Sequence, residues 1–177
     1  MSASPDERSL FRRIRFWLCL FIFGLVASGL TAFPLVQESR ILGQFAGPGT
    51  ALGRLLPTLA EWIRQTNVGL TETGERFPYI AYGTDWLAFG HIVIAIAFIG
   101  PFRDPVRNIW VIEFGLIACI LVIPLALICG PLRGIPWFWQ LIDCSFGVLG
   151  AIPLLIVRKL TRTLAPLSQP VEYTHEA

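Results

Sequence analysis

Four long apolar runs, each with at most one charged residue, constrain this chain more than any other feature of its sequence. The hydrocarbon core of a bilayer is about 30 Å thick. A helix of about 20 apolar residues is long enough to cross it. In chain order the four runs have 22, 17, 19 and 24 residues, and Asp143 is the one charged residue in the last of them. We therefore expect an all-α fold, an integral membrane bundle of four transmembrane helices with spans near residues 16–36, 84–101, 109–130 and 135–157.

The composition also favours lipid as the solvent. The chain is 54% hydrophobic and 15% charged, whereas a soluble domain has about 25% charged residues. A net charge of +2 with no long basic run argues against nucleic acid as a partner. The sequence contains no P-loop, no HExxH and no nucleophile elbow, so we do not predict an enzyme.

The positions of the basic residues predict the orientation, because cytoplasmic flanks of membrane spans are enriched in Lys and Arg. With four spans, segment 1–15, the loop between spans 2 and 3 and the C-terminal segment share one side. The other side has five basic residues, four of them in segment 38–82 beside four acidic ones. We expect both termini in the cytoplasm, with 165–177 as a disordered tail. The nine basic residues of that side are Arg8, Arg12, Arg13, Arg15, Arg103, Arg107, Arg158, Lys159 and Arg162.

A second interpretation of the first span stays open. A basic flank, an apolar stretch and the small residues between Ala27 and Ala32 are also typical of a cleavable signal peptide. The uncharged run exceeds the about 7–15 residues of a usual signal-peptide core. Cleavage would leave three spans and an external N-terminus.

The external segment 38–82 carries the pattern of an amphipathic helix between about residues 50 and 68. Pro57 either begins the main part of this helix or kinks it, and Gly69 is a plausible stop. We expect an outward helix that lies on the membrane surface or caps the bundle, and that offers the best surface for a protein partner. The apolar residues at helical spacing are Leu52, Leu55, Leu56, Leu59, Trp62 and Ile63.

Ionisable residues inside predicted spans are costly and therefore suggest function. At 1.5 Å per helical residue, His91 lies about 9 Å beyond Asp85, and Asp143 lies about 10 Å into the fourth span. Both are expected at similar depth in the outer half of the bundle, where small residues on their helix faces would let spans 2 and 4 approach. The predicted polar cluster consists of His91, Asp143, Gln140, Tyr82, Asp85 and Arg133.

Two interpretations of this polar cluster stay open. In one, it is an outward pocket in which His91 moves a proton, binds a quinone or serves as a single axial haem ligand. In the other, a hydrogen bond between His91 and Asp143 fixes how the two helices pack. His91 is the one histidine within a predicted span, so bis-histidine haem ligation within the chain is not expected.

Glu113 lies near the inner end of the third predicted span. Arg103 and Arg107 in the preceding loop are within reach across a turn that Asp104-Pro105 favours. Because an unpaired charge at that depth is costly, we expect a structural ion pair rather than a proton relay.

The four cysteines all lie in apolar stretches and form no CxxC pair, so we expect neither a zinc site nor a redox motif. We expect small buried side chains, with a disulfide between Cys129 and Cys144 as an alternative. The four residues are Cys19, Cys119, Cys129 and Cys144.

Four segments carry a resemblance: YGTDWLAFGH from Tyr82, GPFRDPVRN from Gly100, RGIPW from Arg133 and LIDCSFG from Leu141. With these segments the chain resembles a family of uncharacterised bacterial four-span inner-membrane proteins. The resemblance spans most of the chain and implies a bacterial inner membrane, but no activity.

Two functional hypotheses follow. The chain is small for an alternating-access transporter, and its halves show no symmetry. We expect a non-catalytic accessory or assembly subunit of a larger membrane complex, or a homo-oligomer, that docks through the helix near 50–68. The alternative is a membrane redox component that binds a quinone or haem at His91 and Asp143.

Overall fold

Helices make up almost all of the described chain, and four helical segments are long and apolar enough to cross a membrane. The computed structural model describes residues 5–167, and this range contains no strand. The four segments are Pro5–Ala32, Pro78–Arg103, Ile109–Leu132 and Trp137–Leu164. The chain is thus a small polytopic all-α membrane protein, as its uncharged runs predict.

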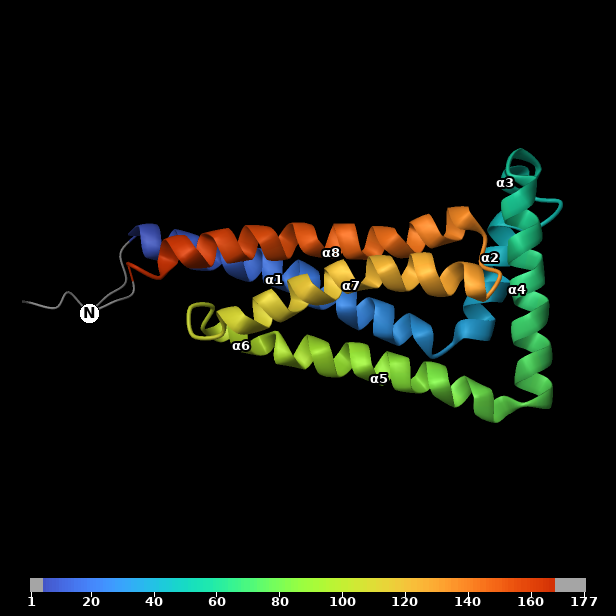
Figure 1. The fold of residues 1–177 in the computed structure, drawn as a ribbon, viewed down its shortest axis with the longest axis horizontal. Helices are drawn as coiled ribbons and strands as arrows, with labels where there is room; N and C mark the ends of the chain where they lie inside the picture. Colours follow the sequence, from blue (N-terminus) through green and yellow to red (C-terminus); the bar gives the residue numbers. More distant parts are fainter. Residues whose placement is uncertain (1–4, 168–177) are drawn as a thin grey trace, which may run out of the picture. The chain divides into compact units, whose positions relative to one another are not determined.

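The chain divides into two compact units. Unit 1 comprises the described parts of 1–23 and 96–177, and unit 2 comprises 24–95. Figure 1 shows the elements in chain order from blue to red. They are α1 (Pro5–Ala32), α2 (Leu35–Ala46), α3 (Ala51–Leu55), α4 (Pro57–Arg76), the 3₁₀ helix η1 (Pro78–Ala81), α5 (Tyr82–Ala97), α6 (Ile99–Arg103), α7 (Ile109–Leu132) and α8 (Trp137–Leu164).

The first and last helices extend beyond the uncharged runs into the basic segments. Helix α1 begins at Pro5, with Asp6 and Glu7 in its first turn. A proline in the first turn and acidic residues near the N-terminal, positive end of the helix dipole are signals that a helix begins there. The prediction of the span from uncharged residues alone did not use them. Helix α8 continues to Leu164 and carries its three basic residues on the helix itself. The predicted disordered tail falls outside the described residues except for 165–167, which form a turn at the end of α8.

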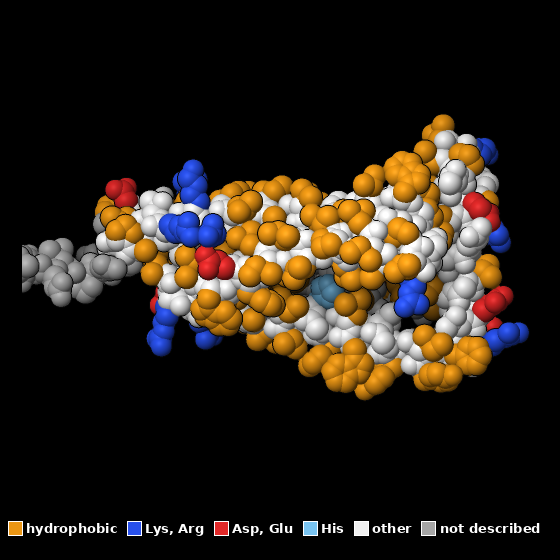
Figure 2. Space-filling model, in the orientation of Figure 1, with side chains coloured by type: hydrophobic (Ala, Val, Ile, Leu, Met, Phe, Trp, Pro, Cys, Tyr) orange, Lys and Arg blue, Asp and Glu red, His pale blue; other side chains and the backbone are white. Residues whose placement is uncertain are grey.

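The core of unit 1 lies between α7, α8 and the first part of α1. Helices α7 and α8 run side by side, and hydrophobic side chains cover most of their length (Figures 1 and 2). Charged side chains gather near the end of α8. The fully buried apolar side chains of this unit are Ile14, Leu18, Phe98, Ile112, Leu154, Val157 and Leu164.

Glycines let the helices of unit 1 approach closely. A Cβ atom on Gly115 of α7 would lie 2.6 Å from Phe98 Cζ and 2.7 Å from Leu154 Cδ1. A Cβ atom on Gly147 of α8 would collide with the carbonyl oxygen of Cys119 on α7. Helices in lipid associate by close backbone packing, for which small residues are needed at the contact.

The second membrane-length segment is broken between α5 and α6. Pro101 has no N–H group, and its ring would clash with the carbonyl of Ala97 four residues earlier in a continuous helix. The chain therefore leaves the helix at Phe98 and re-enters it at Ile99. The following turn is closed by Asp104, whose Oδ1 accepts a hydrogen bond from the Arg107 backbone at 3.0 Å. This is the turn predicted from Asp104-Pro105.

Unit 2 contains the amphipathic region, but two helices replace the predicted single one. Helix α3 begins after Thr50, whose hydroxyl oxygen accepts a hydrogen bond from the Gly53 N–H at 2.9 Å. It ends at Leu55, and Pro57 occupies the first turn of α4, so the proline begins the main helix rather than kinking it. The predicted stop at Gly69 is wrong, because α4 continues to Arg76 while packing against α2.

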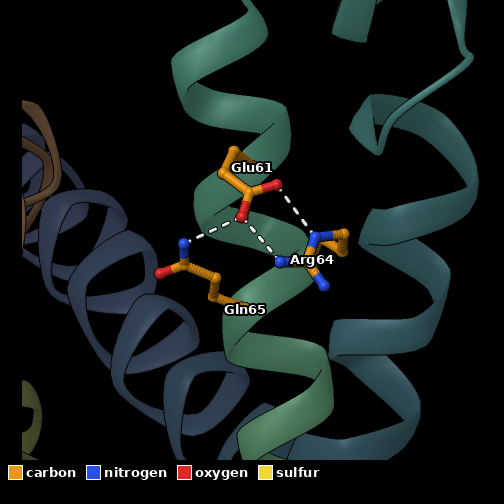
Figure 3. Close-up of polar contacts among 3 residues, drawn as sticks. All are labelled: Glu61, Arg64 and Gln65. Carbon is orange, nitrogen blue, oxygen red and sulfur yellow. Dashed lines mark hydrogen bonds and ion pairs between the residues drawn. The ribbon is translucent and has the colours of Figure 1, made fainter.

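The exposed face of α4 carries a local polar network (Figure 3). Arg64 donates two hydrogen bonds to the Glu61 carboxylate, at 2.7 and 2.8 Å, and Gln65 donates a third at 2.8 Å. The hydrogen bond from Arg64, then that from Gln65, lowers the pKa of Glu61 to about 2. The buried face holds Ala60 and Ile63. Helix α4 is therefore amphipathic, as predicted.

Candidate functional site

His91 lies on α5 and is half-buried. Its Nδ1 atom is 2.8 Å from the carbonyl oxygen of Leu87, one helical turn earlier. Because a carbonyl oxygen only accepts hydrogen bonds, this contact is a hydrogen bond when Nδ1 carries the proton. The Nε2 atom then has its lone pair available to accept a hydrogen bond or to bind a metal.

The face of α5 that carries His91 is packed against Gly29 of α1 in unit 2. A Cβ atom on Gly29 would lie 3.0 Å from the Ala88 carbonyl oxygen and 3.1 Å from His91 Cβ. Ala88 and Ala95 are both buried. The predicted small-residue face is thus present, and α1 approaches it. Gly29 lies in the small-residue stretch between Ala27 and Ala32, a pattern that also fits a signal-peptide cleavage region, so the sequence did not indicate this helix contact.

Asp143 lies on α8 and is half-buried. Its carboxylate has no hydrogen bond or ion pair with any residue in the described range 5–167. His91 belongs to unit 2 and Asp143 to unit 1. The pairing of these two residues therefore stays a prediction.

Gln140 and Arg133 lie where α7 turns into α8. The Gln140 side chain is 7% exposed, and its Nε2 donates to the Ile135 carbonyl oxygen at 2.7 Å. Its Cγ lies 2.7 Å from where a Cβ on Gly130 would stand. Gly134 adopts a φ of +69°, which favours glycine, and Arg133 is exposed. The Gln140 amide therefore stabilises the turn.

The structure brings Tyr82 and Asp85 together in a groove of about 350 Å³ in unit 2. The ring centroids of Tyr82 and Trp86 are 6.0 Å apart, and those of Trp86 and Phe89 are 5.9 Å apart, both edge to face. The aromatic groove is lined by Phe33, Tyr82, Asp85, Trp86 and Phe89. It is a mainly aromatic cleft with one carboxylate, and it contains two of the predicted polar residues.

Glu113 forms an ion pair, but with other partners than we expected. Its Oε1 is 3.1 Å from Arg158 Nε and 3.7 Å from Arg162 Nη2, both on α8. The prediction of Arg103 or Arg107 is therefore corrected. Residues four apart share one helix face, and α8 continues past its apolar run as a helix, which places both arginines beside the start of α7. All three side chains are 35–59% exposed, so the pair contributes about 1 kcal/mol or less.

The cysteines only partly follow the expectation of small buried side chains. Cys119 and Cys144 are half-buried, whereas Cys19 and Cys129 are exposed on apolar helices. All four thiols are free, so the structure does not contain the disulfide between Cys129 and Cys144. Within residues 5–167, no three His, Cys, Asp or Glu side chains are grouped so that they could hold a metal ion.

Comparison with protein-family models, with curated proteins and with solved structures finds no match to this chain.

Proposed function

We propose that the protein is a non-catalytic accessory or assembly subunit of a larger complex in a bacterial inner membrane. The observation that carries this proposal is an exposed apolar surface on α2 and α3, in the segment between the first two spans. Large contiguous apolar patches outside a lipid-facing belt mark interaction sites. This α2–α3 apolar surface is formed by residues that are 41–77% exposed: Ile41, Leu42, Phe45, Leu52, Leu55 and, directly after α3, Leu56.

A protein partner suits this surface better than the hydrocarbon of a bilayer. Residues 47–50 connect α2 to α3 as a turn. Irregular backbone of this kind is excluded from lipid-exposed positions in the hydrocarbon, because its polar groups need partners. Arg40 and Arg54 are exposed on the same two helices. An apolar centre with charged residues at its rim is the usual composition of a protein interface.

The test is the mass of the tagged full chain after purification from its own membrane in a mild detergent. We expect a stoichiometric complex with other subunits, and Phe45→Ser combined with Leu55→Ser should reduce it to a single chain. Phe77→Ser combined with Ile80→Ser is the matched control, since both residues are large, apolar and about half exposed in the same unit. A single-chain mass for the wild type, or equal loss in both variants, would contradict the proposal.

The orientation belongs to the same proposal. The nine basic residues at the start of α1, at the end of α6 and in the loop after it, and on the last turns of α8 support cytoplasmic termini. A reporter fused after Ala177 should therefore be cytoplasmic, and one inserted near Gly74 of α4 should be external. The reverse pattern would contradict this orientation.

A second function is favoured by one observation, the hydrogen bond from His91 Nδ1 to the Leu87 carbonyl oxygen. It leaves Nε2 as the nitrogen able to bind a haem iron or to contact a quinone. If haem is bound, the purified protein should show a Soret band that His91→Ala removes. His175→Ala, outside the described residues, is the control. A colourless preparation with no bound quinone would exclude this function.

The pairing of His91 with Asp143 has its own test. If the two side chains form a structural hydrogen bond, His91→Ala and Asp143→Ala should be non-additive in a double-mutant cycle of unfolding free energies. Purely additive effects would exclude the pair.

A further inference from the structure

Four arginines of unit 1 line a single groove. Arg8, Arg12 and Arg15 are spaced four and three residues apart, so they share one face of α1. Arg103 is the last residue of α6. The groove has a volume of about 720 Å³. The arginine groove is lined, in the described part of the chain, by Pro5, Arg8, Phe11, Arg12, Arg15 and Arg103.

The arginine groove combines positive charge with apolar surface, and its described lining contains no carboxylate. Arg8, Arg12 and Arg103 have no ion pair with any residue in the range 5–167. Each guanidinium group therefore keeps its planar set of N–H donors available. Such a set matches the oxygens of a phosphate group in a bidentate manner.

Arg15 is held in place by its neighbours. Its Nε donates to the Phe102 carbonyl oxygen at 3.3 Å. Its guanidinium carbon lies 5.8 Å from the centroid of the Phe11 ring and 5.4 Å from that of Phe102. Both contacts are favourable cation–π geometries, and they leave the two terminal nitrogens free to donate. A pre-positioned donor loses less conformational entropy when a ligand binds.

Along the membrane normal, the arginine groove is expected at the level of the lipid headgroups. The uncharged run of the first span begins at Phe16, directly after Arg15, and that of the second ends at Phe102, directly before Arg103. The arginines thus stand where two hydrocarbon-spanning segments meet the polar layer, and Phe11 supplies an apolar side. Basic pockets at this depth between membrane helices are suited to anionic headgroups.

We propose that the arginine groove is a binding site for an anionic phospholipid, whose phosphate is held by Arg8, Arg12, Arg15 and Arg103. The acyl chains of the lipid extend from the groove along the membrane-spanning part of α1, whose uncharged run begins at Phe16. The arginine groove shares no residue with the α2–α3 apolar surface and does not include His91, so this proposal does not depend on the proposed function.

Native mass spectrometry of the full chain in detergent tests this site. The probes are phosphatidylglycerol, phosphatidylcholine with the same acyl chains, and inorganic phosphate. We expect phosphatidylglycerol to bind more tightly than phosphatidylcholine, and Arg12→Gln to reduce that affinity by about fivefold. Arg12→Lys keeps the charge but loses the bidentate donor set, so its affinity for phosphatidylglycerol should lie between those of the wild type and Arg12→Gln.

Arg13→Gln is the matched control, because Arg13 is a neighbouring exposed arginine of α1 outside the groove. It should change the phosphatidylglycerol affinity by less than about twofold, since only long-range charge is lost. Equal helical content by circular dichroism shows that the variants are folded. Equal losses in Arg12→Gln and Arg13→Gln would overturn the site, as would equal binding of the two lipids. Tight binding of inorganic phosphate alone would overturn the assignment to a lipid.

Discussion

Gly147 of α8 lies so close to α7 that adding a single methyl group there should strongly lower the stability of the protein. In Gly147→Ala, the new Cβ would collide with the Cys119 carbonyl oxygen and would lie 2.6 Å from Val122 Cγ1. The carbonyl belongs to the backbone of α7, so relief requires the two helices to separate rather than a side chain to rotate. Overpacking of this kind costs about 1–3 kcal/mol.

Gly90→Ala on α5 is the control for this substitution. No atom lies within 4 Å of the position of its Cβ. Both substitutions gain the same helix propensity, about 1 kcal/mol in water. The difference between the two variants therefore isolates the collision.

The assay is reversible unfolding in mixed micelles with rising sodium dodecyl sulfate, followed by circular dichroism. We expect Gly147→Ala to be less stable than Gly90→Ala by about 1–3 kcal/mol. Adding Val122→Ala should restore part of this loss, because it removes one of the two contacts but leaves the carbonyl. Equal stability of the two glycine variants would show that α7 and α8 do not approach as the structure describes.

Two further predictions concern ion pairs. Glu113→Gln and Arg158→Gln should each lower the unfolding free energy by about 1 kcal/mol or less, and a double-mutant cycle should show coupling between them. The corresponding cycle of Glu113 with Arg107 should show none, and coupling there would restore the loop pair. At the surface of α4, Glu61 should titrate at about 2 by NMR, and Arg64→Ala should return its pKa toward 4.5. Because the folded pKa is lowered, the stabilisation is present above the unfolded value and is lost as pH falls from about 4.5 through 2.

The candidate site was only partly predictable from the sequence. Helical spacing placed Ala88 and Ala95 on the His91 face, and the structure buries both. Helical spacing could not show that the Gln140 side chain donates to the Ile135 carbonyl, since that bond depends on the turn after α7, which passes through Gly134 with its positive φ. The arginines of α1 indicated orientation, but only folding brings Arg103 beside them.

What the sequence determined by itself is the number and type of the long elements. Lipid-compatible length and the absence of charge are properties of contiguous residues, so four spans and an amphipathic segment follow from counting. Local signals offered Pro57 as the start of the main helix or as a kink, and the structure has it in the first turn of α4. They wrongly predicted that the helix stops at Gly69, whereas α4 packs against α2 and continues to Arg76. Which arginine forms the ion pair with Glu113 was decided only by the tertiary structure. Glu113 pairs with Arg158, 45 residues away, rather than with a nearby loop arginine, because the antiparallel packing of α7 and α8 brings their charged ends together.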